Sequence, residues 1–421
     1  MKTNASAKRK PLLSREAKDR TITYIMLAVI FTAVQLYVSS GKAGRSFTGL
    51  LVPTCVYILA AMSLNLVVGV SGELSLGAAG FMCIGAFTGS VFSILTKDAI
   101  TETFIRFPLA ILLGGVVAAV FGFLIGIPVL RLRGDYLAIV TLAFGEIIKS
   151  VMNNLYLTVD KNGAFVSMST EAKAAHVFDM ETKKDIIKGA QGITGTPRDS
   201  TFIICFAVVF IAMIIMLNFM DSKQGRAVMA SRDNRIAAEA MGVNVTRAKM
   251  SAFVMSAFFG GVAGVLYSHN LATLQAVKFD YNLSILILVF VVLGGMGNIS
   301  GSIISAAVLT FINVKLQTQL SGDLAALKQL IYALILIVMV MWNNAPALRG
   351  IREKVNIRSL IDFFTEKVLK KQETAPEGGI DPPASASWDK IPTKIPMDAI
   401  LSTDITPDNP YEADPPKKEE K

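Results

Sequence analysis

Residues 221–264 read DSKQGRAVMASRDNRIAAEAMGVNVTRAKMSAFVMSAFFGGVAG and form a polar, basic segment between two long apolar runs. Within it, residues 234–241 predict a short helix, because Asp233 can cap its start and Gly242 can end it in a left-handed conformation. One face of this helix is small or apolar, and Arg235 and Glu239 stand one turn apart on another; the apolar face consists of Ile236, Ala237, Ala240 and Met241. Such a face can lie in a groove of a partner protein, and an ordinary amphipathic loop is the alternative.

The composition is typical of a protein embedded in a membrane. Hydrophobic residues make up 52% of the 421 residues and charged residues 17%, whereas a soluble domain carries about a quarter charged residues. The apolar residues gather in runs long enough to cross a bilayer, for which ~20 residues are needed. We therefore expect an all-α fold, a polytopic bundle of transmembrane helices. The net charge of +9 lies in particular loops, so it reports orientation rather than nucleic-acid binding.

The apolar runs predict about ten spans, or about eight if two Gly-rich breaks are re-entrant. The N-terminal residues, the loops after the fourth and sixth spans and the tail are basic, which is typical of cytoplasmic segments. Both termini are therefore expected in the cytoplasm. The spans are expected at about residues 24–38, 48–70, 107–130, 133–154, 200–220, 251–269 and 327–342, with one more before residue 90 and two between 282 and 314.

Glycine and serine crowd residues 63–90, which read SLNLVVGVSGELSLGAAGFMCIGAFTGS. This spacing allows helix backbones to approach closely, or it marks a broken helix that lines a polar cavity. Residues 133–154 read RGDYLAIVTLAFGEIIKSVMNN, in which Glu146 and Lys149 can pair on one helical face. Ionisable groups inside a span are costly and usually face the bundle interior, so this pair has either a structural role or a role in translocation.

The segment RIAAEAMGVNVTRAKMSAF, residues 235–253, resembles the EAA loop of ABC importer permeases, the coupling helix that docks on the ATPase subunit. It looks most like the branched-chain amino-acid (Leu/Ile/Val) permease family. The Gly/Ser block and RGDYLAIVTLAFGEII resemble the same family, and so does GAQGITGTP, residues 189–197. The resemblance covers roughly residues 64–314. Glu73 departs from it, since a neutral amide is more usual there.

The resemblance implies the membrane subunit of an ABC importer that carries branched-chain amino acids across the bacterial inner membrane. It implies a homologous permease subunit, two ATP-binding cassette subunits and a periplasmic substrate-binding protein as partners. ATP would bind to the partner subunits, so we expect no cofactor, no metal site and no enzymatic activity in this chain. The residues expected to couple to the ATPase are Arg235, Ala238, Glu239, Ala240 and Gly242. Those expected to line the substrate path are Asn65, Ser71, Ser75, Thr141 and Glu146.

On this interpretation the chain has four parts. Residues 1–22 form a basic cytoplasmic N-terminus, and residues 23–343 form the transmembrane permease domain. Within the permease domain, residues 159–199 form a periplasmic loop without basic excess, and residues 221–250 form the cytoplasmic coupling loop. Residues 344–371 predict an amphipathic helix on the membrane lipid, and the Pro-rich residues 372–421 a disordered tail.

Two other classes of protein remain open. A secondary transporter of small amino acids or amides would use Glu146 to couple transport to protons or ions. A membrane scaffold that binds partners through its tail leaves the Gly-rich spans unexplained. No phosphate-binding loop is present, because the only Gly-Lys pair, Gly41-Lys42, lacks the required glycine and hydroxyl residues. Cysteine and histidine give no disulfide or metal pattern, since they are few and scattered: Cys55, Cys83, Cys205, His176 and His269.

Overall fold

The computed structural model describes residues 24, 27, 31–32, 34–40, 44–97, 99–100, 102–132, 134–160, 163–169, 184–319, 334 and 337. The chain divides into two compact units, Met1–Ala345 and Pro346–Lys421, and every described residue belongs to the first. The predictions for residues 1–22, 344–371 and 372–421 lie outside the described residues. So do parts of the predicted span at 24–38 and almost all of that at 327–342.

Seven helices of the described part are long and apolar enough to cross a membrane, which confirms a polytopic helical membrane protein. An eighth helix, α12, has a shorter apolar stretch, Ile299–Val314. The count of about ten spans stays a prediction, as does the side of the membrane on which the termini lie. These eight helices are α2 (Arg45–Asn65), α3 (Ala78–Leu95), α4 (Thr103–Val129), α5 (Asp135–Asn154), α7 (Phe202–Asp221), α10 (Val245–Ser268), α11 (Tyr281–Gly294) and α12 (Ile299–Gln319). The span that contains α11 begins at Ala276, in the short turn before the helix.

Helices α3, α4 and α10 pack closely against one another, and glycines make this possible. A Cβ added to Gly85 would overlap the backbone of Gly261, and one added to Gly264 would overlap the backbone of Met82. Helix packing inside a membrane favours such small residues, because backbones in direct contact gain dispersion energy over a large area. The predicted close approach of backbones in the Gly/Ser block is confirmed at Gly85.

The same Gly/Ser block also contains a break in the helix. Helix α2 runs into a π-helix, Leu66–Val70, and the Ser71 N–H donates to Leu66 O at 3.1 Å. Gly72 then takes a φ of +72°, and the chain is non-helical as far as Gly77, just before α3 begins. The block therefore combines both structures that its glycines allow: a broken helix before α3 and tight packing along α3.

The structure corrects the all-α expectation in the loop at 159–199 and beside it. Five short strands form an antiparallel sheet in the order β2-β1-β3-β4-β5: β1 (Tyr156–Asp160), β2 (Gly163–Ser167), β3 (Lys184–Lys188), β4 (Ile193–Thr194) and β5 (Thr273–Leu274). Asp160 pairs with Gly163, so β1 and β2 form a tight hairpin. The polar loop composition concealed these strands, although Asn162-Gly163 is a dipeptide typical of hairpin turns.

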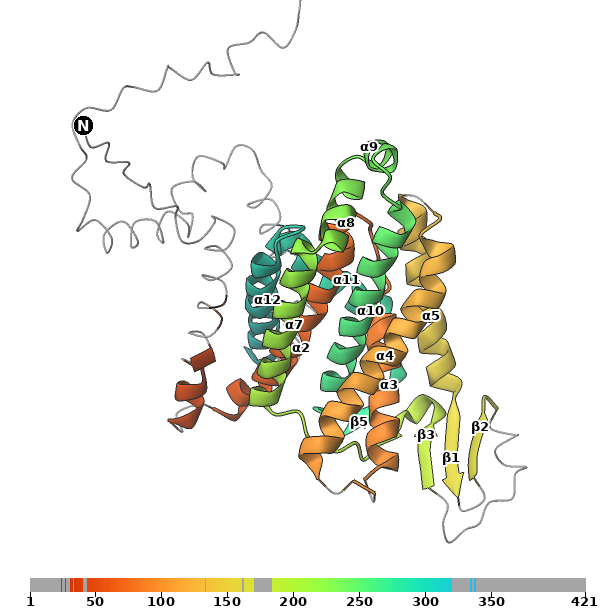
Figure 1. Cartoon of the computed structure of the whole chain (residues 1–421). Coiled ribbons are helices and arrows are strands. Elements are labelled where there is room, and N and C mark those ends of the chain that lie inside the picture. The colour runs from red at the N-terminus through yellow and green to blue at the C-terminus, as the bar shows by residue number, and fades with distance from the viewer. Residues whose placement is uncertain are drawn as a thin grey trace, which may run out of the picture. The chain divides into compact units, whose positions relative to one another are not determined.

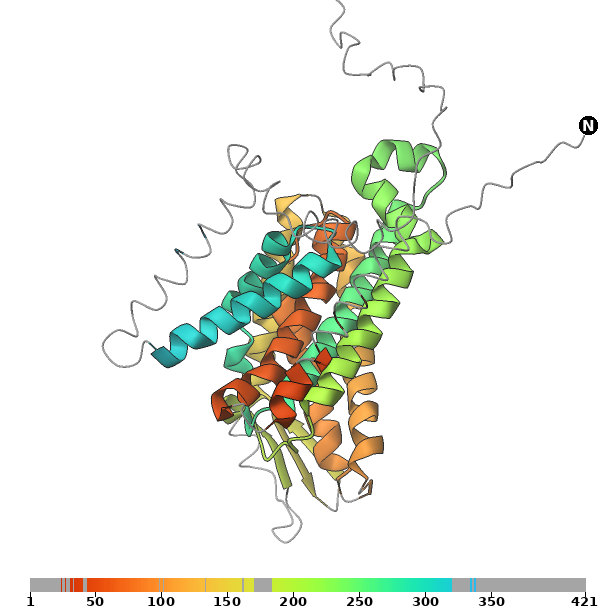
Figure 2. The ribbon, with the colours of Figure 1, turned by 90° about the vertical axis from the view of Figure 1, so that its left-hand side faces the viewer.

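The sheet and the polar segment 221–250 lie at opposite ends of the helical bundle (Figures 1 and 2). Helix α7 leads into α8 (Lys223–Asp233) and α9 (Arg235–Ala240), which project beyond the bundle before α10 returns into it. We call the end of the bundle that carries α8 and α9 the α9 end, and the opposite end, which carries the five strands, the sheet end. Along the sides, α4 and α5 expose apolar residues such as Leu112, Phe123, Ile139 and Ile147, as helices that face lipid or another membrane subunit do.

Polar contacts tie the helices together at the sheet end. Arg106, at the start of α4, pairs with Asp199 at 3.0 Å, and both side chains are largely buried. His269 is fully buried just after α10; its Nδ1 lies 2.9 Å from Val265 O and its Nε2 2.8 Å from Ser93 Oγ. Burial lowers the pKa of His269, because a charged imidazolium would lose its hydration. A neutral ring that donates to Val265 and accepts from Ser93 explains both contacts and indicates a structural role.

Candidate coupling helix and substrate crevice

The short helix α9 is capped at both ends. The Asn234 side chain accepts from the Ala237 N–H at 3.0 Å, so Asn234 is the N-cap and the prediction of Asp233 was wrong by one residue. Asp233 is instead the last residue of α8 and pairs with Arg232 at 2.9 Å. The reason is geometric: Asn234 has the extended backbone that an N-cap requires, with φ −151° and ψ 105°.

The end of α9 agrees with the sequence. Gly242 has a φ of +80°, the left-handed conformation that favours glycine, and its N–H donates to Glu239 O at 3.0 Å. The Val243 N–H donates to Ala238 O, also at 3.0 Å, so two carbonyls of the last turn are satisfied. These caps hold a helix of six residues that would be unstable alone.

Some side chains of α9 pack against the rest of the chain, and others are exposed to solvent. Arg235 and Glu239 form the expected pair, with 2.9 Å between Nε and Oε1. Ile236 and Met241 are 81% and 84% exposed, whereas Ala238 is buried. Two large apolar side chains on the tip of a polar loop are costly in water and are typical of a protein-binding surface. Of the five predicted coupling residues, Ala238 therefore packs inward rather than outward.

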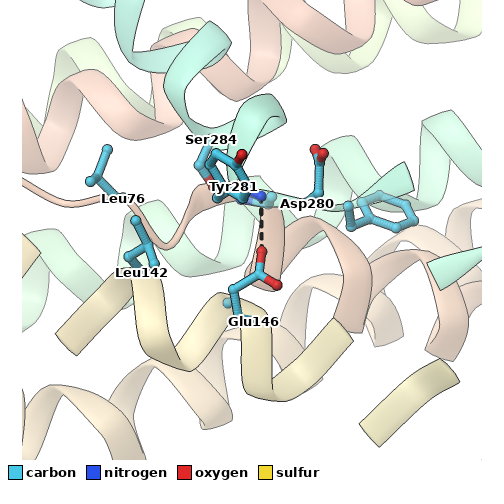
Figure 3. A pocket seen from close by; sticks show the side chains of 9 residues that line it. Leu76, Leu142, Glu146, Asp280, Tyr281 and Ser284 are labelled. Carbon is cyan, nitrogen blue, oxygen red and sulfur yellow. Dashed lines mark hydrogen bonds between the residues drawn. The ribbon is translucent and has the colours of Figure 1, made fainter. Parts of the chain in front are cut away.

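A small crevice lies where α5, the start of α11 and the start of α3 meet (Figure 3). The Glu146 carboxylate points to the start of α11, where its Oε1 accepts from the Tyr281 N–H at 3.0 Å (Figure 3). Its other oxygen pairs with Lys149, as expected from their spacing. The crevice combines polar groups with apolar walls and is lined by Leu76, Ala79, Leu142, Gly145, Glu146, Phe279, Asp280, Tyr281 and Ser284.

Hydrogen bonds hold the segment before α3 in this crevice. The Leu76 N–H donates to Thr141 Oγ1 at 3.0 Å, and the Ala79 N–H donates to Ser284 Oγ at 3.1 Å. Of the five predicted path residues, Glu146 lines the crevice, Thr141 bonds to Leu76 in its wall, and Ser75 directly precedes Leu76 without lining the crevice. Asp280, Tyr281 and Ser284 were missed by sequence reasoning, although an aspartate before an apolar run is a signal for a helix start.

Two predicted path residues have other surroundings. Asn65 is fully buried; its Oδ1 accepts from the Gly297 N–H at 2.9 Å and its Nδ2 donates to Ser302 Oγ at 3.0 Å. Ser71 is buried at the end of the π-helix. Neither residue lines the crevice. Asn65 instead joins the broken helix to the turn between α11 and α12.

Replacing Asn65 with leucine is expected to lower the free energy of unfolding by about 1–3 kcal/mol, because the Gly297 N–H would lose its acceptor. Ser302→Ala removes the acceptor of the Asn65 Nδ2 but leaves the bond to Gly297, so its effect should be smaller. Unfolding in detergent, followed by circular dichroism, measures both. Equal stability of Asn65→Leu and wild type would show that the contact contributes nothing.

These features together define a class of protein. A bundle of membrane-spanning helices with a broken helix, a partly polar crevice and a capped helix beyond one end is the architecture of a membrane transport subunit. The family described as "Branched-chain amino acid transport system / permease component" matches residues 46–340. The chain therefore belongs to this family of transporter permease subunits, which are not enzymes.

Three relatives carry related names. The chain is 31% identical to the high-affinity branched-chain amino acid transport system permease protein LivM of Salmonella typhimurium (strain LT2), over 83% of this chain and 80% of that protein. It is 30% identical to the LivM protein of Escherichia coli (strain K12), over the same shares of both chains. A probable branched-chain amino acid transport permease protein LivM of Methanocaldococcus jannaschii is 24% identical, over 62% of this chain and 77% of that protein. No solved structure shows a significant match.

Proposed function

We propose that this chain moves leucine, isoleucine and valine across the inner membrane of a bacterium into the cytoplasm. ATP binds to and is hydrolysed by partner ATP-binding cassette subunits, and this chain holds no cofactor. The partner ATPase docks on helix α9, which contains Arg235, Ala238, Glu239 and Ala240, and on Gly242, which ends the helix. The membership of the chain in a permease family supports this proposal.

The surface of α9 carries the proposal. Ile236 and Met241 are exposed on and at the end of a short, capped helix, and a partner groove would remove both from water. The α9 end is also strongly basic, as cytoplasmic loops are. The basic residues of this segment are Lys223, Arg226, Arg232, Arg235, Arg247 and Lys249.

The crevice is too narrow for a substrate in this structure, but the chemistry of its lining supports an amino acid with an apolar side chain once the helices around it move apart. The ammonium of a zwitterion needs acceptors, which the carboxylates of Glu146 and Asp280 offer beside their bonds to the Tyr281 and Leu283 N–H groups, and its carboxylate needs a donor, which the Ser284 hydroxyl offers. A branched aliphatic side chain needs apolar walls, which Leu76 and Leu142 offer. The path then runs past Thr141 and along the segment that contains Ser75 and Ser71, with Asn65 as a support.

The remaining surfaces accommodate the other partners. The exposed apolar side of α5, with Tyr136 and Ile139, is available to a homologous permease subunit or to membrane lipid. The sheet end would face the periplasm, where a substrate-binding protein delivers the amino acid. Its exposed side chains include Val166 and Met168.

Reconstitution tests the proposal. The chain is placed in lipid vesicles with a homologous permease subunit, two ATPase subunits and the binding protein, and uptake of radiolabelled leucine is followed. We expect uptake that requires ATP and the binding protein and that unlabelled isoleucine and valine compete for. Uptake driven by a proton gradient without ATP would contradict the proposal and favour the secondary transporter.

Glu146→Gln separates these two classes at one residue. Glutamine retains an oxygen that can accept from the Tyr281 N–H and from a substrate ammonium but lacks the charge opposite Lys149, so ATP-driven uptake should fall by no more than about tenfold, the effect of one weakened charged hydrogen bond. Uptake coupled to a proton on Glu146 would instead be lost, because an amide does not titrate. The measurement compares initial uptake rates with and without a protonophore. Glu102→Gln, an exposed glutamate before α4, is the matched control.

A further inference from the structure

The last turn of α8 contacts the broken helix directly. The Arg232 Nη1–H donates to Gly69 O, inside the π-helix, at 2.9 Å. The aliphatic stem of Arg232 lies against Gly72, where an added Cβ would come 2.5 Å from the Arg232 Cγ. Arg232 and Gly69 are 163 positions apart in sequence, so only the fold brings Arg232 to the Gly69 carbonyl.

The helix break explains why Gly69 O is available. Where a helix ends, its last carbonyls lack an intrahelical donor and need another partner. The Ser71 N–H bonds to Leu66 O and the Glu73 N–H to Val67 O, so the amides after the break reach back to carbonyls before Gly69. The Arg232 guanidinium supplies a charged donor to Gly69 O, and hydrogen bonds from a charged donor are stronger than neutral ones.

A second contact comes from the first turns of α10. Lys249 pairs with Glu73, and only 12% and 15% of their side chains are exposed. Removing one partner from such a pair leaves an uncompensated, largely buried charge. Arg232 and Lys249 lie on the two sides of α9, so both connections from α9 back to the bundle are fastened to residues 69–73.

Residues 69–73, which Arg232 and Lys249 hold, are followed closely in sequence by a residue of the crevice wall. Leu76, three residues after Glu73, lines the crevice and donates its N–H to Thr141. Residues 71–77 are non-helical, so movement at Gly69 and Glu73 can reach Leu76 without breaking a helical hydrogen-bond ladder. On the other side, Gly69 packs so closely on Gly297 that a Cβ would overlap its nitrogen.

We propose that Arg232 and the Lys249–Glu73 pair are positioning residues that transmit the displacement of α9 to the wall of the crevice through residues 69–77. This inference rests on the proposed docking of the ATPase on α9. ATP-driven movement of α9 pulls α8 and α10, and these two contacts move the segment that holds Leu76. Without them, ATP hydrolysis continues while the crevice stays in one state.

Uncoupling is the first test, in the complete reconstituted complex. We expect Arg232→Ala to retain at least half of the ATP hydrolysis rate and to lose at least 90% of leucine uptake, so the ratio of uptake to hydrolysis falls about tenfold. Arg226→Ala is the matched control, because Arg226 lies on the same helix and its side chain bonds to a nearby residue of the same loop, Asp221 O, at 2.6 Å. A parallel loss of hydrolysis and uptake in Arg232→Ala would overturn the proposal and assign Arg232 to assembly or docking.

Charge reversal tests the ion pair. Glu73→Lys and Lys249→Glu should each lower the ratio of leucine uptake to ATP hydrolysis, because like charges would face each other in a largely buried position. The double variant restores an opposite pair and should recover at least half of the wild-type ratio. Single variants that couple normally, or a double variant no better than either single one, would overturn the role of the pair.

A labelling experiment separates this inference from the choice of substrate. Leu74→Cys places a thiol at a position that is 39% exposed on the moving segment, and the native cysteines Cys55, Cys83 and Cys205 are buried. We expect ATP with vanadate to change the rate of maleimide labelling at position 74, and Arg232→Ala to abolish that change. A change that persists in Arg232→Ala, or no change in the parent variant, would overturn the inference. A normal labelling response without leucine uptake would instead contradict the proposed substrate alone.

Discussion

Replacing Ile236 with aspartate is expected to reduce ATP-driven leucine uptake to about 1% or less of wild type, because the ATPase would no longer dock. Ile236 is 81% exposed on α9, and the proposed groove would bury it. Burying an isoleucine side chain contributes roughly 1.5–3 kcal/mol, and an aspartate in the same groove would also lose its hydration. Met241→Asp should act in the same direction, since Met241 is 84% exposed at the C-cap of the same helix.

Co-purification of the ATPase subunits with the tagged chain measures docking separately from transport. Ile236→Leu retains the apolar volume and should behave as wild type. Val166→Asp introduces the same charge on β2 at the sheet end, where Val166 is 60% exposed, and should not disturb the ATPase. Normal co-purification and uptake by Ile236→Asp would show that α9 does not dock in this way.

Gly85→Val is expected to prevent the chain from accumulating as a folded protein. Its Cβ would overlap the backbone of Gly261, and a backbone cannot rotate away as a side chain can. Helices α3 and α10 would have to separate, and α4 packs against both. Overpacking in a close-packed core commonly costs about 1–3 kcal/mol, and a clash with backbone lies at the upper end of that range or beyond it.

The expected observation is aggregation or loss of the main peak in size-exclusion chromatography of a fluorescent fusion in detergent. Gly49→Val is the matched control: Gly49 lies in α2, and nothing stands within 4 Å of its added Cβ. This control should elute as wild type does. A Gly85→Val protein that is monodisperse and as heat-stable as the control would mean that α3 and α10 do not pack as described.

Local rules predicted much of the coupling segment correctly. The left-handed Gly242, the pairing of Arg235 with Glu239 and the exposed Ile236 and Met241 each depend on residues within about one helical turn. The cap was placed one residue too early, because Asp and Asn are both good caps and only the backbone of Asn234 decides between them. Ala238 was expected among the coupling residues, and its burial depends on neighbouring elements of the fold.

The crevice was predictable only in part. Glu146 and Thr141 stood out because polar groups inside an apolar span are costly. Asn65 stood out for the same reason, but its hydrogen bonds to Gly297 and Ser302 connect parts of the chain more than 230 positions apart. No local pattern distinguishes a polar residue that lines a path from one that ties two helices together.

The sequence by itself determined the class of fold, since long apolar runs in water or lipid have few alternatives to membrane-spanning helices. It also determined the capped helix between two spans. Only the tertiary structure decided that β1, β2, β3 and β4 form one sheet with the distant β5, and that Arg232 and Lys249 reach Gly69 and Glu73. The physical reason is range: propensity, capping and periodicity act over a few residues, whereas these contacts depend on how the helices between them pack.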